Sequence, residues 1–330
     1  MTAASTETSF EPNHVANTHD AYPSRVSSRP KIIPRLDPIV YGNADDGPLS
    51  AEQLKDYEQN GFLILPGFLS QNIVDGCLTE LTRLCESPAI CERPEAIVEP
   101  EREELRSLFA VHNPEISTFF RRVAAEPELV KMAMQILGGE VSLHQSRVNL
   151  KPGFAGQEFY WHSDFETWHV EDGMPRMRAV SFSILLTDNR PQNGPLMLIP
   201  QSHRHFVACV GETPDDHYRM SLRRQEYGVP DHESLEQLVA LGGITSAIGP
   251  PGTVILFDCN TMHGSNSNIT PLPRANLFFV YNSVANSLQA PFCGKAPRPE
   301  FIAARDRLLE AAPACVDDAN LEWSAHHNDE

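Results

Sequence analysis

The second half of the chain consists of short apolar runs separated by turn-forming residues. The runs are rich in β-branched and aromatic side chains and cover residues 141–150, 158–162, 178–186, 196–199, 253–258 and 276–284. Strands of this length at close spacing are typical of a β-sandwich or barrel, the jelly-roll type included. We therefore expect a mainly β fold in this part of the chain.

Helical patterns precede these strands. Ser50, with Gln53 three residues later, forms a capping-box pattern that predicts the start of a helix. A short buried strand is expected over 62–66, and Ser70 then precedes apolar residues at helical spacing. A further helix is expected over 126–137, where two glycines end the pattern. We therefore expect helices to flank the sheet.

Three segments differ in composition from the rest. Residues 1–45 are polar and without a period, so we expect a mobile or surface-bound tail outside the core. Residues 311–330 form a second expected tail, which leaves a single domain over 46–310. Within that domain the polar stretch 210–245 interrupts the strands, with one helix expected over 234–241. Long insertions of this kind are often lids.

Charge and cysteine content limit the partners and the compartment. The chain has 26 Lys and Arg against 44 Asp and Glu, a formal charge of −18 at pH 7, which repels phosphate backbones and anionic lipid headgroups. We expect no nucleic acid and no membrane as partner. The N-terminal residues lack the apolar run of a secretion signal, and the 7 cysteines form no Cys-x-x-Cys pair. The expectation is a cytoplasmic protein with reduced cysteines.

A histidine and a carboxylate stand two residues apart at the end of the aromatic run 158–162. They are His162 and Asp164, and in a strand this spacing places both side chains on one face. A third candidate, His263, follows the apolar run 253–258. Two imidazoles and one carboxylate are the facial-triad ligands of non-haem iron(II) oxygenases, which leave positions open for a co-substrate and dioxygen.

The histidine-carboxylate pattern alone is weak, because the chain has 13 histidines and such a pair is more often an ordinary polar contact. The pair ends an aromatic strand and a later His-Gly-Ser follows a second strand, and this context favours a metal site. His203 and His205 are better explained as fixing a turn, and His326 and His327 lie in the polar C-terminal tail. No His-Glu-x-x-His pattern suggests a zinc hydrolase.

Residues 159–175, FYWHSDFETWHVEDGMP, resemble the signature segment of ectoine hydroxylases, a branch of the phytanoyl-CoA dioxygenase-like superfamily. Two flanking elements agree with this resemblance. Residues 60–68 resemble the N-terminal segment of the superfamily, and residues 193–204 resemble its element running from Asn-Gly-Pro to Pro-x-Ser-His. The resemblance covers roughly residues 50–305.

The resemblance implies a double-stranded β-helix core of the jelly-roll, cupin-like type with flanking helices, and specific site residues. It implies Fe(II) bound by His162, Asp164 and His263. It implies 2-oxoglutarate contacts, with an arginine fork for the distal carboxylate, at Asn149, Lys151, Ser265 and Arg274. It implies contacts to a zwitterionic substrate, with aromatic faces for its cation, at Gln145, Trp168, Phe257, Asn276, Phe278 and Arg298. Without the resemblance, Arg274 would be a surface ion pair, and Phe257 and Phe278 could as well be core residues.

The reaction that the resemblance implies is hydroxylation of ectoine to 5-hydroxyectoine. It would use Fe(II), 2-oxoglutarate and O2, release succinate and CO2, and take place in a cytoplasmic homodimer that makes a compatible solute for the stress response. One alternative is the same chemistry on another small zwitterionic metabolite or amino acid. Halogenation is disfavoured because Asp164 occupies the position that a halide would need. A non-catalytic jelly-roll binding protein is the alternative from another class.

Overall fold

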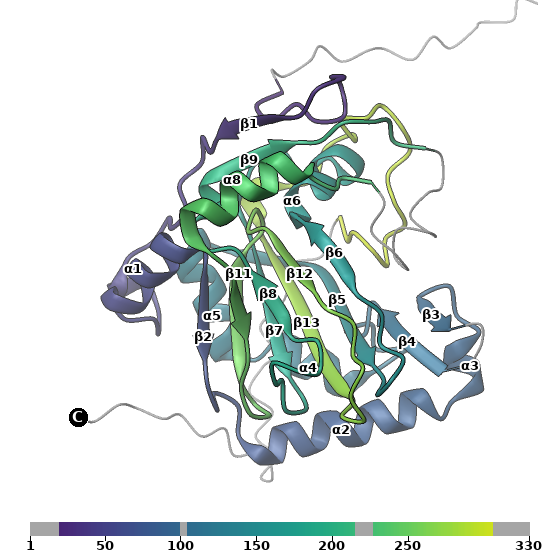
Figure 1. The fold of residues 1–330 in the computed structure, drawn as a ribbon. Coiled ribbons are helices and arrows are strands. Elements are labelled where there is room, and N and C mark those ends of the chain that lie inside the picture. Colours follow the sequence, from purple (N-terminus) through teal and green to yellow (C-terminus); the bar gives the residue numbers. More distant parts are fainter. Residues whose placement is uncertain (1–19, 100–103, 215–226, 306–330) are drawn as a thin grey trace, which may run out of the picture.

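The computed structural model describes residues 20–99, 104–214 and 227–305, and β-sheets dominate it (Figure 1). The largest sheet has seven strands in the order β2-β11-β7-β13-β5-β4-β3. In that order their bounds are Phe62–Leu65, Val254–Asp258, Ala179–Leu185, Arg274–Ser283, Val141–Lys151, Glu104–Phe109 and Ala96–Glu99. Neighbouring strands are antiparallel throughout, as expected for a mainly β fold.

Two smaller antiparallel sheets complete the β structure. A four-stranded sheet has the order β10-β8-β12-β6, with bounds Thr245–Ala247, Leu196–Leu198, His263–Ser265 and Phe159–His162. A two-stranded ribbon pairs β1, Lys31–Pro34, with β9, His205–Ala208. Figure 1 shows β8 and β12 in front of the long strands of the large sheet.

Helices surround the sheets, as the sequence predicts. The α-helices are α1 Ala51–Asn60, α2 Gln71–Cys85, α3 Pro88–Cys91, α4 Thr118–Ala124, α5 Pro127–Leu137, α6 Asp164–Thr167 and α8 His232–Gly242. Shorter helical turns are η1 Ala44–Asp46, the π-helical η2 Trp168–Asp172, η3 Ser202–Arg204 and η4 Val284–Asn286. None of the described helices has both the length and the apolar character needed to span a membrane.

The start and end of α1 follow from local sequence. The Ser50 side chain accepts from the backbone N–H of Gln53, and the Gln53 side chain accepts from the backbone of Ser50, which confirms the predicted capping box. Gly61 ends the helix at φ 81°, a conformation that favours glycine. A Cβ atom at this position would also lie 2.3 Å from Nδ1 of His203. The close approach of η3 to α1 therefore depends on this glycine.

The two faces of the large sheet bury different clusters. Paired residues on neighbouring strands share a face, and one face, including Val148, Leu277 and Phe182, packs against the apolar sides of α1, α2, α4 and α5. The opposite face, including Phe257 and Phe278, packs against β8 and β10 of the small sheet. The space between the two sheets is therefore lined by the second face, and the functional side chains lie there.

The predicted N-terminal boundary of the core is wrong for residues 20–45. Tyr22 is fully buried in a cluster that includes Phe165 and Trp168, and its hydroxyl donates to Asp37 at 2.8 Å. This segment also contributes β1. Isolated apolar side chains anchor an extended segment without producing a periodic pattern, so composition alone misses the packing.

Other boundaries stay predictions. Residues 1–19 and 306–330 lie outside the described residues, as does 215–226, so the single domain over 46–310, the C-terminal tail and the lid function of 210–245 are not tested. The helix expected over 234–241 is present as α8.

Candidate active site

The register of the small sheet brings the predicted metal ligands together. β12 pairs with β6 so that His263 lies opposite His162, and their ring centroids are 4.2 Å apart. The Nε2 atoms of His162 and His263 lie 3.6 and 3.8 Å from Oδ1 of Asp164. One ligand atom from each residue lies within 4.8 Å of the others, and no second group of this kind occurs among the described residues.

Asp164 reaches this group by a different route from the one expected. The sequence predicts that His162 and Asp164 share one face of a strand, but β6 ends at His162 and Asp164 is the first residue of α6. Ser163 is extended between them and serves as the helix N-cap. The two ligands therefore converge because the chain turns from strand to helix, and the predicted strand geometry is wrong.

The histidine tautomers suit a metal. Nδ1 of His162 donates to the carbonyl of Tyr160 at 2.8 Å, and Nδ1 of His263 donates to the carbonyl of Thr261 at 2.9 Å. Because Nδ1 carries the proton in each neutral ring, the Nε2 lone pairs point to the shared space. Burial lowers the pKa of His263 to about 4, so its imidazole is neutral at pH 7.

Asp164 supplies the negative charge of the group. Burial would raise the pKa of this carboxyl, but His263 and His162, and then Arg147, lower the pKa well below its ordinary range. Two imidazoles and one carboxylate are the donor set of a non-haem iron(II) site, so the residues fit the metal that the sequence predicts.

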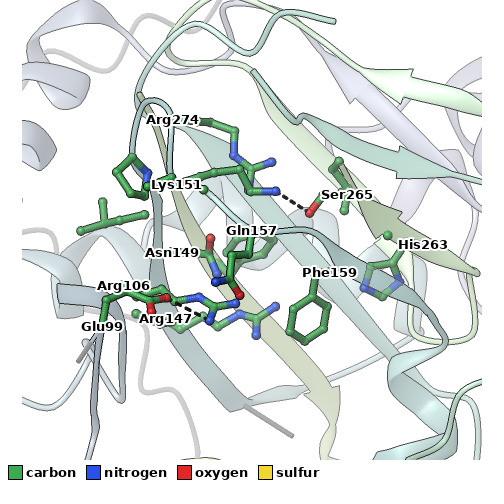
Figure 2. Close-up of a pocket in the computed structure, with 18 of the residues that line it drawn as sticks. Glu99, Arg106, Arg147, Asn149, Lys151, Gln157, Phe159, His263, Ser265 and Arg274 are labelled. Carbon is green, nitrogen blue, oxygen red and sulfur yellow. Dashed lines mark hydrogen bonds and ion pairs between the residues drawn. The ribbon is translucent and has the colours of Figure 1, made fainter. Parts of the chain in front are cut away.

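A cavity between the sheets opens beside the ligand group (Figure 2). Its walls come mainly from β5, β13, β6 and β12. Seven of the predicted site residues line it, together with Arg147 and Phe159: His162, His263, Asn149, Lys151, Ser265, Arg274 and Phe278.

The predicted co-substrate cations are buried in this cavity without acidic partners. Lys151 and Arg274 are both 5% exposed and lie opposite each other on β5 and β13. Lys151 donates to Ser265 Oγ at 2.9 Å and to the carbonyl of Asn266, and Arg274 donates to the carbonyl of Gly194. Neither forms an ion pair with an acid of the described residues, and Nε of Arg274 has no partner. Uncompensated buried cations are costly unless an anion joins them.

The electrostatics of Lys151 reflect this crowding of positive charge. Burial, and then the neighbouring charges of Arg274 and Arg106, lower the pKa of Lys151 to about 7. Burial, and then Arg147, lower the pKa of Arg274 to about 10. A bound dianion would reverse the charge contribution to both shifts.

The Asn-Gly-Pro element at residues 193–195 lies against Lys151 and Arg274. Gly194 adopts φ +69°, and a Cβ atom there would lie 2.4 Å from the carbonyl oxygen of Asn266 and 3.1 Å from Nζ of Lys151. Its own carbonyl accepts from Arg274. The glycine thus lets the backbone approach both cations, which a side chain would prevent.

The predicted substrate residues occupy a neighbouring part of the interior. Of these only Phe278 lines the cavity. The Phe257 ring lies 5.0 Å from the His263 ring, and Asn276 has a buried Oδ1 without a partner. Gln145 donates to the carbonyl of Ile302, and Trp168 packs its ring edge-on to His144 at 4.9 Å.

Arg298 differs from its simplest interpretation as a free carboxylate anchor. Its Nε and Nη2 donate to the two carboxylate oxygens of Asp172 at 2.8 and 2.5 Å. This bidentate pair leaves Nη1 and the second hydrogen of Nη2 for a ligand. Asp172 therefore holds Arg298 in place at the end of η2.

The other acids of the signature segment hold the N-terminal segment. Arg25 donates from Nε and Nη2 to Glu166 at 3.0 and 2.7 Å and from Nη1 to Glu171 at 2.7 Å. Ser24 adds a hydrogen bond to Glu166 at 2.6 Å. α6 and η2, which carry Asp164 and Trp168, are thus fastened by a segment that is distant in sequence.

Sequence reasoning missed Arg147 and His144. Arg147 lines the cavity, and its position was detectable, because Gln145, Arg147, Asn149 and Lys151 are polar at every second position of one strand. His144 is fully buried with neither ring nitrogen hydrogen-bonded. It lies at a register shift of β5 opposite Val280 and Tyr281, which no sequence pattern predicts.

Comparison with known proteins agrees with this site. The model of the phytanoyl-CoA dioxygenase (PhyH) family matches residues 57–276. An ectoine dioxygenase of Bordetella parapertussis is 54% identical over 300 residues, which are 91% of this chain and 97% of that protein. An ectoine dioxygenase of Stutzerimonas stutzeri is 53% identical over 290 residues, 88% and 95% of the two chains.

Solved structures agree as well. EctD from S. alaskensis, crystallised with 2-oxoglutarate and 5-hydroxyectoine, has a TM-score of 0.79 and 47% identity over 88% of this chain and 97% of that one. EctD from S. alaskensis with bound Fe has a TM-score of 0.78 and 47% identity, over 87% of this chain and 95% of that one. AviO1 from Streptomyces viridochromogenes, 21% identical with a TM-score of 0.54, shares the fold. The predicted jelly-roll core and the predicted resemblance are confirmed, and the chain belongs to the phytanoyl-CoA dioxygenase family.

Proposed function

We propose that this protein is an Fe(II)- and 2-oxoglutarate-dependent dioxygenase that hydroxylates ectoine to 5-hydroxyectoine. The observation that carries the proposal is the juxtaposition of a His-Asp-His group with a cavity in which Lys151 and Arg274 form no ion pair with an acid of the described residues. Its relatives at more than half identity are ectoine dioxygenases, and EctD was crystallised with both 2-oxoglutarate and 5-hydroxyectoine.

In this proposal His162, Asp164 and His263 hold Fe(II) through two Nε2 atoms and one carboxylate oxygen. Bound iron supplies the activation of O2, coupled to conversion of 2-oxoglutarate into succinate and CO2, and the hydroxyl group goes to carbon 5 of ectoine. The protein keeps the ligand geometry through the carbonyls of Tyr160 and Thr261, which fix the two rings.

The cavity cations hold 2-oxoglutarate. Arg274 offers a guanidinium fork to the distal carboxylate, and Lys151 and Ser265 contribute an ammonium and a hydroxyl beside it. Asn149 lies on the same face of β5, two residues before Lys151. Because these groups are already placed by the two strands, the diacid meets a preorganised site.

The ectoine contacts are the residues that adjoin this cavity. Trp168, Phe257 and Phe278 present ring faces or edges to the amidinium cation of the substrate. Gln145, Asn276 and Arg298 offer polar groups, with the Nη1 side of Arg298 directed to the carboxylate while Asp172 holds the other side. The substrate is thereby positioned beside the iron ligands and shielded from water.

The test is turnover by the full chain. Protein loaded with Fe(II) is incubated with 2-oxoglutarate, air and ectoine, and 5-hydroxyectoine and succinate are quantified. Equimolar formation of both is expected, and His263→Ala should form neither. Succinate formed with another small zwitterion, such as an amino acid, but not with ectoine, would keep the reaction class and reject the substrate. Absence of iron-dependent succinate with every substrate would favour a binding protein.

We further propose that the enzyme works as a homodimer in the cytoplasm and that its product serves as a compatible solute in the stress response. The net charge of −18 is consistent with a soluble protein that avoids nucleic acids and anionic membranes. Light scattering after size-exclusion chromatography tests the dimer, and growth of a deletion strain at high salt tests the solute role.

A further inference from the structure

Arg147 is a cavity-lining cation to which the proposed function assigns no role. It lies on β5 on the same face as Asn149 and Lys151. Its Nε atom is shielded from solvent and has no hydrogen-bond partner, and the guanidinium forms no ion pair with an acid of the described residues. An arginine in such surroundings is costly unless a ligand compensates its charge.

Two phenyl rings hold the guanidinium in place. Its Cζ atom lies 4.9 Å from the centre of the Phe278 ring, which is opposite on β13, and 5.9 Å from that of Phe109 on β4. Contacts of this type use the faces of the aromatic rings and leave the N–H groups available. The side chain is therefore oriented by packing while its donors remain for a ligand in the cavity.

The position of Arg147 complements that of Arg274 and Lys151. The latter two lie at one end of the cavity and Arg147 lies at the other, with Asn149 between them (Figure 2). Four residues along a strand separate the Cα atoms of Arg147 and Lys151 by roughly 13 Å. Arg147 stacks on Phe278, which packs in the same cluster as Phe257, and the Phe257 ring lies 5.0 Å from the ring of the iron ligand His263.

We propose that Arg147 is the second carboxylate-binding residue for the co-substrate. It pairs with the carboxylate of 2-oxoglutarate that lies nearer the iron ligands, whereas Arg274 and Lys151 pair with the distal carboxylate. The inference rests on the proposed function and deepens it. Four basic side chains line the cavity, and Arg106 among them is paired with Glu99. The inference explains why the other three, Arg147, Lys151 and Arg274, face a molecule with two negative charges at opposite ends.

The assignment favours the co-substrate over ectoine because of which side chains share the cavity. Arg147 lines it together with Lys151 and Arg274, whereas only Phe278 of the six residues assigned to ectoine does so. A residue for the ectoine carboxylate would be expected beside Arg298, which does not line this cavity.

Equilibrium binding to the iron-loaded chain under anaerobic conditions tests the inference. Three acids are titrated by calorimetry: 2-oxoglutarate, 2-oxopentanoate, which lacks the distal carboxylate, and 4-oxopentanoate, which lacks the carboxylate next to the ketone. Arg147→Met should weaken 2-oxoglutarate and 2-oxopentanoate by about 10- to 100-fold, the value of a hydrogen bond between charged groups, and leave 4-oxopentanoate unchanged. Arg274→Met should weaken 2-oxoglutarate and 4-oxopentanoate instead.

Two further variants control for packing. Arg178 also stacks on an aromatic ring, 4.1 Å from the centre of Tyr41, but outside the cavity, so Arg178→Met should not change any of the three affinities. Arg147→Lys keeps the charge but loses the fork, and should weaken the two 2-oxo acids by less than Arg147→Met does. This variant provides the test if Arg147→Met does not fold.

The outcomes separate the inference from the proposed function. If Arg147→Met weakens the affinity for all three acids equally, or weakens only ectoine binding, the role of Arg147 is overturned and the dioxygenase proposal stays intact. If Arg147→Met binds 2-oxoglutarate as tightly as the unaltered protein while Arg274→Met binds it weakly, the role of Arg147 is likewise overturned and the dioxygenase proposal stands. If the unaltered protein binds no 2-oxo acid, the proposed function itself fails.

Discussion

Lys151 is a cavity residue whose charge changes near neutral pH. Burial, Arg274 and Arg106 together lower its pKa to about 7, against the opposing effect of Glu158. A carboxylate bound beside Lys151 favours the protonated ammonium and therefore binds most tightly to the protein in which Lys151 carries its proton. The affinity for 2-oxoglutarate is thus linked to the protonation of this one side chain.

We expect 2-oxoglutarate affinity to fall as pH rises above 7. The free protein loses the Lys151 proton in this range, so each further pH unit should weaken binding by up to about tenfold until the pKa of the complex is reached. Calorimetry between pH 6 and 9 measures the slope. Lys151→Met should bind weakly with a flatter profile, and an equally steep profile in that variant would assign the pH dependence to another group.

Asp164 is the one negative charge of the ligand group, so its loss should affect the metal first. Changes to groups that merely support metal ligands cost about 10- to 100-fold in affinity, and Asp164→Asn should cost more than that. Iron retained after dialysis, measured by atomic emission, checks this. Asp188→Asn alters an exposed carboxylate paired with Arg190 and should retain the iron of the unaltered protein.

At this scale the sequence predicts identities better than contacts. The signature segment is sufficient to name His162 and Asp164, because their spacing is local. The pairing of Arg298 with Asp172 could not be predicted, since the two residues are 126 positions apart and no pattern links them. Arg147 could have been found from the alternation of polar residues along β5, a signal that the resemblance to a family does not supply.

At the scale of elements, α6 and η2 depend on a distant segment for their position. Arg25 forms a buried ion-pair cluster with Glu166 and Glu171, and the three side chains are 3% or less exposed. Removing one member of such a cluster leaves the others as uncompensated buried charges. The element that carries Asp164 and Trp168 is therefore stabilised by the N-terminal segment.

We expect Arg25→Met to lower the free energy of unfolding by about 3 to 5 kcal/mol, because Glu166 and Glu171 would remain buried without their cation. Urea denaturation followed by circular dichroism measures the change. Arg29→Met, a few residues along in the same segment but exposed, should stay within about 0.5 kcal/mol of the unaltered protein. A loss below about 1 kcal/mol in Arg25→Met would show that the glutamates relax towards solvent.

Elements with a clear apolar pattern are predictable, and several short ones without it are not. The helices α1, α2, α5 and α8 and the strands β2, β5, β6, β7, β8, β11 and β13 correspond to expected segments. The strands β1, β3, β4, β9, β10 and β12 were not expected, because they are short and lack a distinct apolar run. β12 carries His263, so the candidate site depends on an element that only pairing with β6 and β8 defines.

At the scale of the whole molecule, burial distinguishes the cysteines of the described residues. Cys77, Cys209 and Cys259 are buried, Cys85 is exposed, and Cys91 and Cys293 are intermediate. Burial raises the pKa of the Cys77 thiol to about 12 and holds the pKa of Cys209 and Cys259 well above the ordinary value. Thiolate, the reactive form, is therefore scarce at the buried positions.

Alkylation of the native protein at pH 8, followed by peptide mass spectrometry, should modify Cys85 and spare the three buried thiols. All of them should react in urea. Rapid native labelling of Cys259, which lies directly after β11 beside the candidate site, would mean that the interior between the sheets opens to solvent on the timescale of the reaction.

The two facing sheets supply different parts of the site, and this separation affects how such an enzyme can evolve. The His-Asp-His group depends on the smaller sheet and on α6 after it, whereas the basic side chains proposed to bind 2-oxoglutarate depend on β5 and β13 of the larger sheet. Substitutions in the seven-stranded sheet can therefore change which organic acid binds without altering the metal ligands. Natural or laboratory selection can therefore act on the metal site and on the acid-binding site separately.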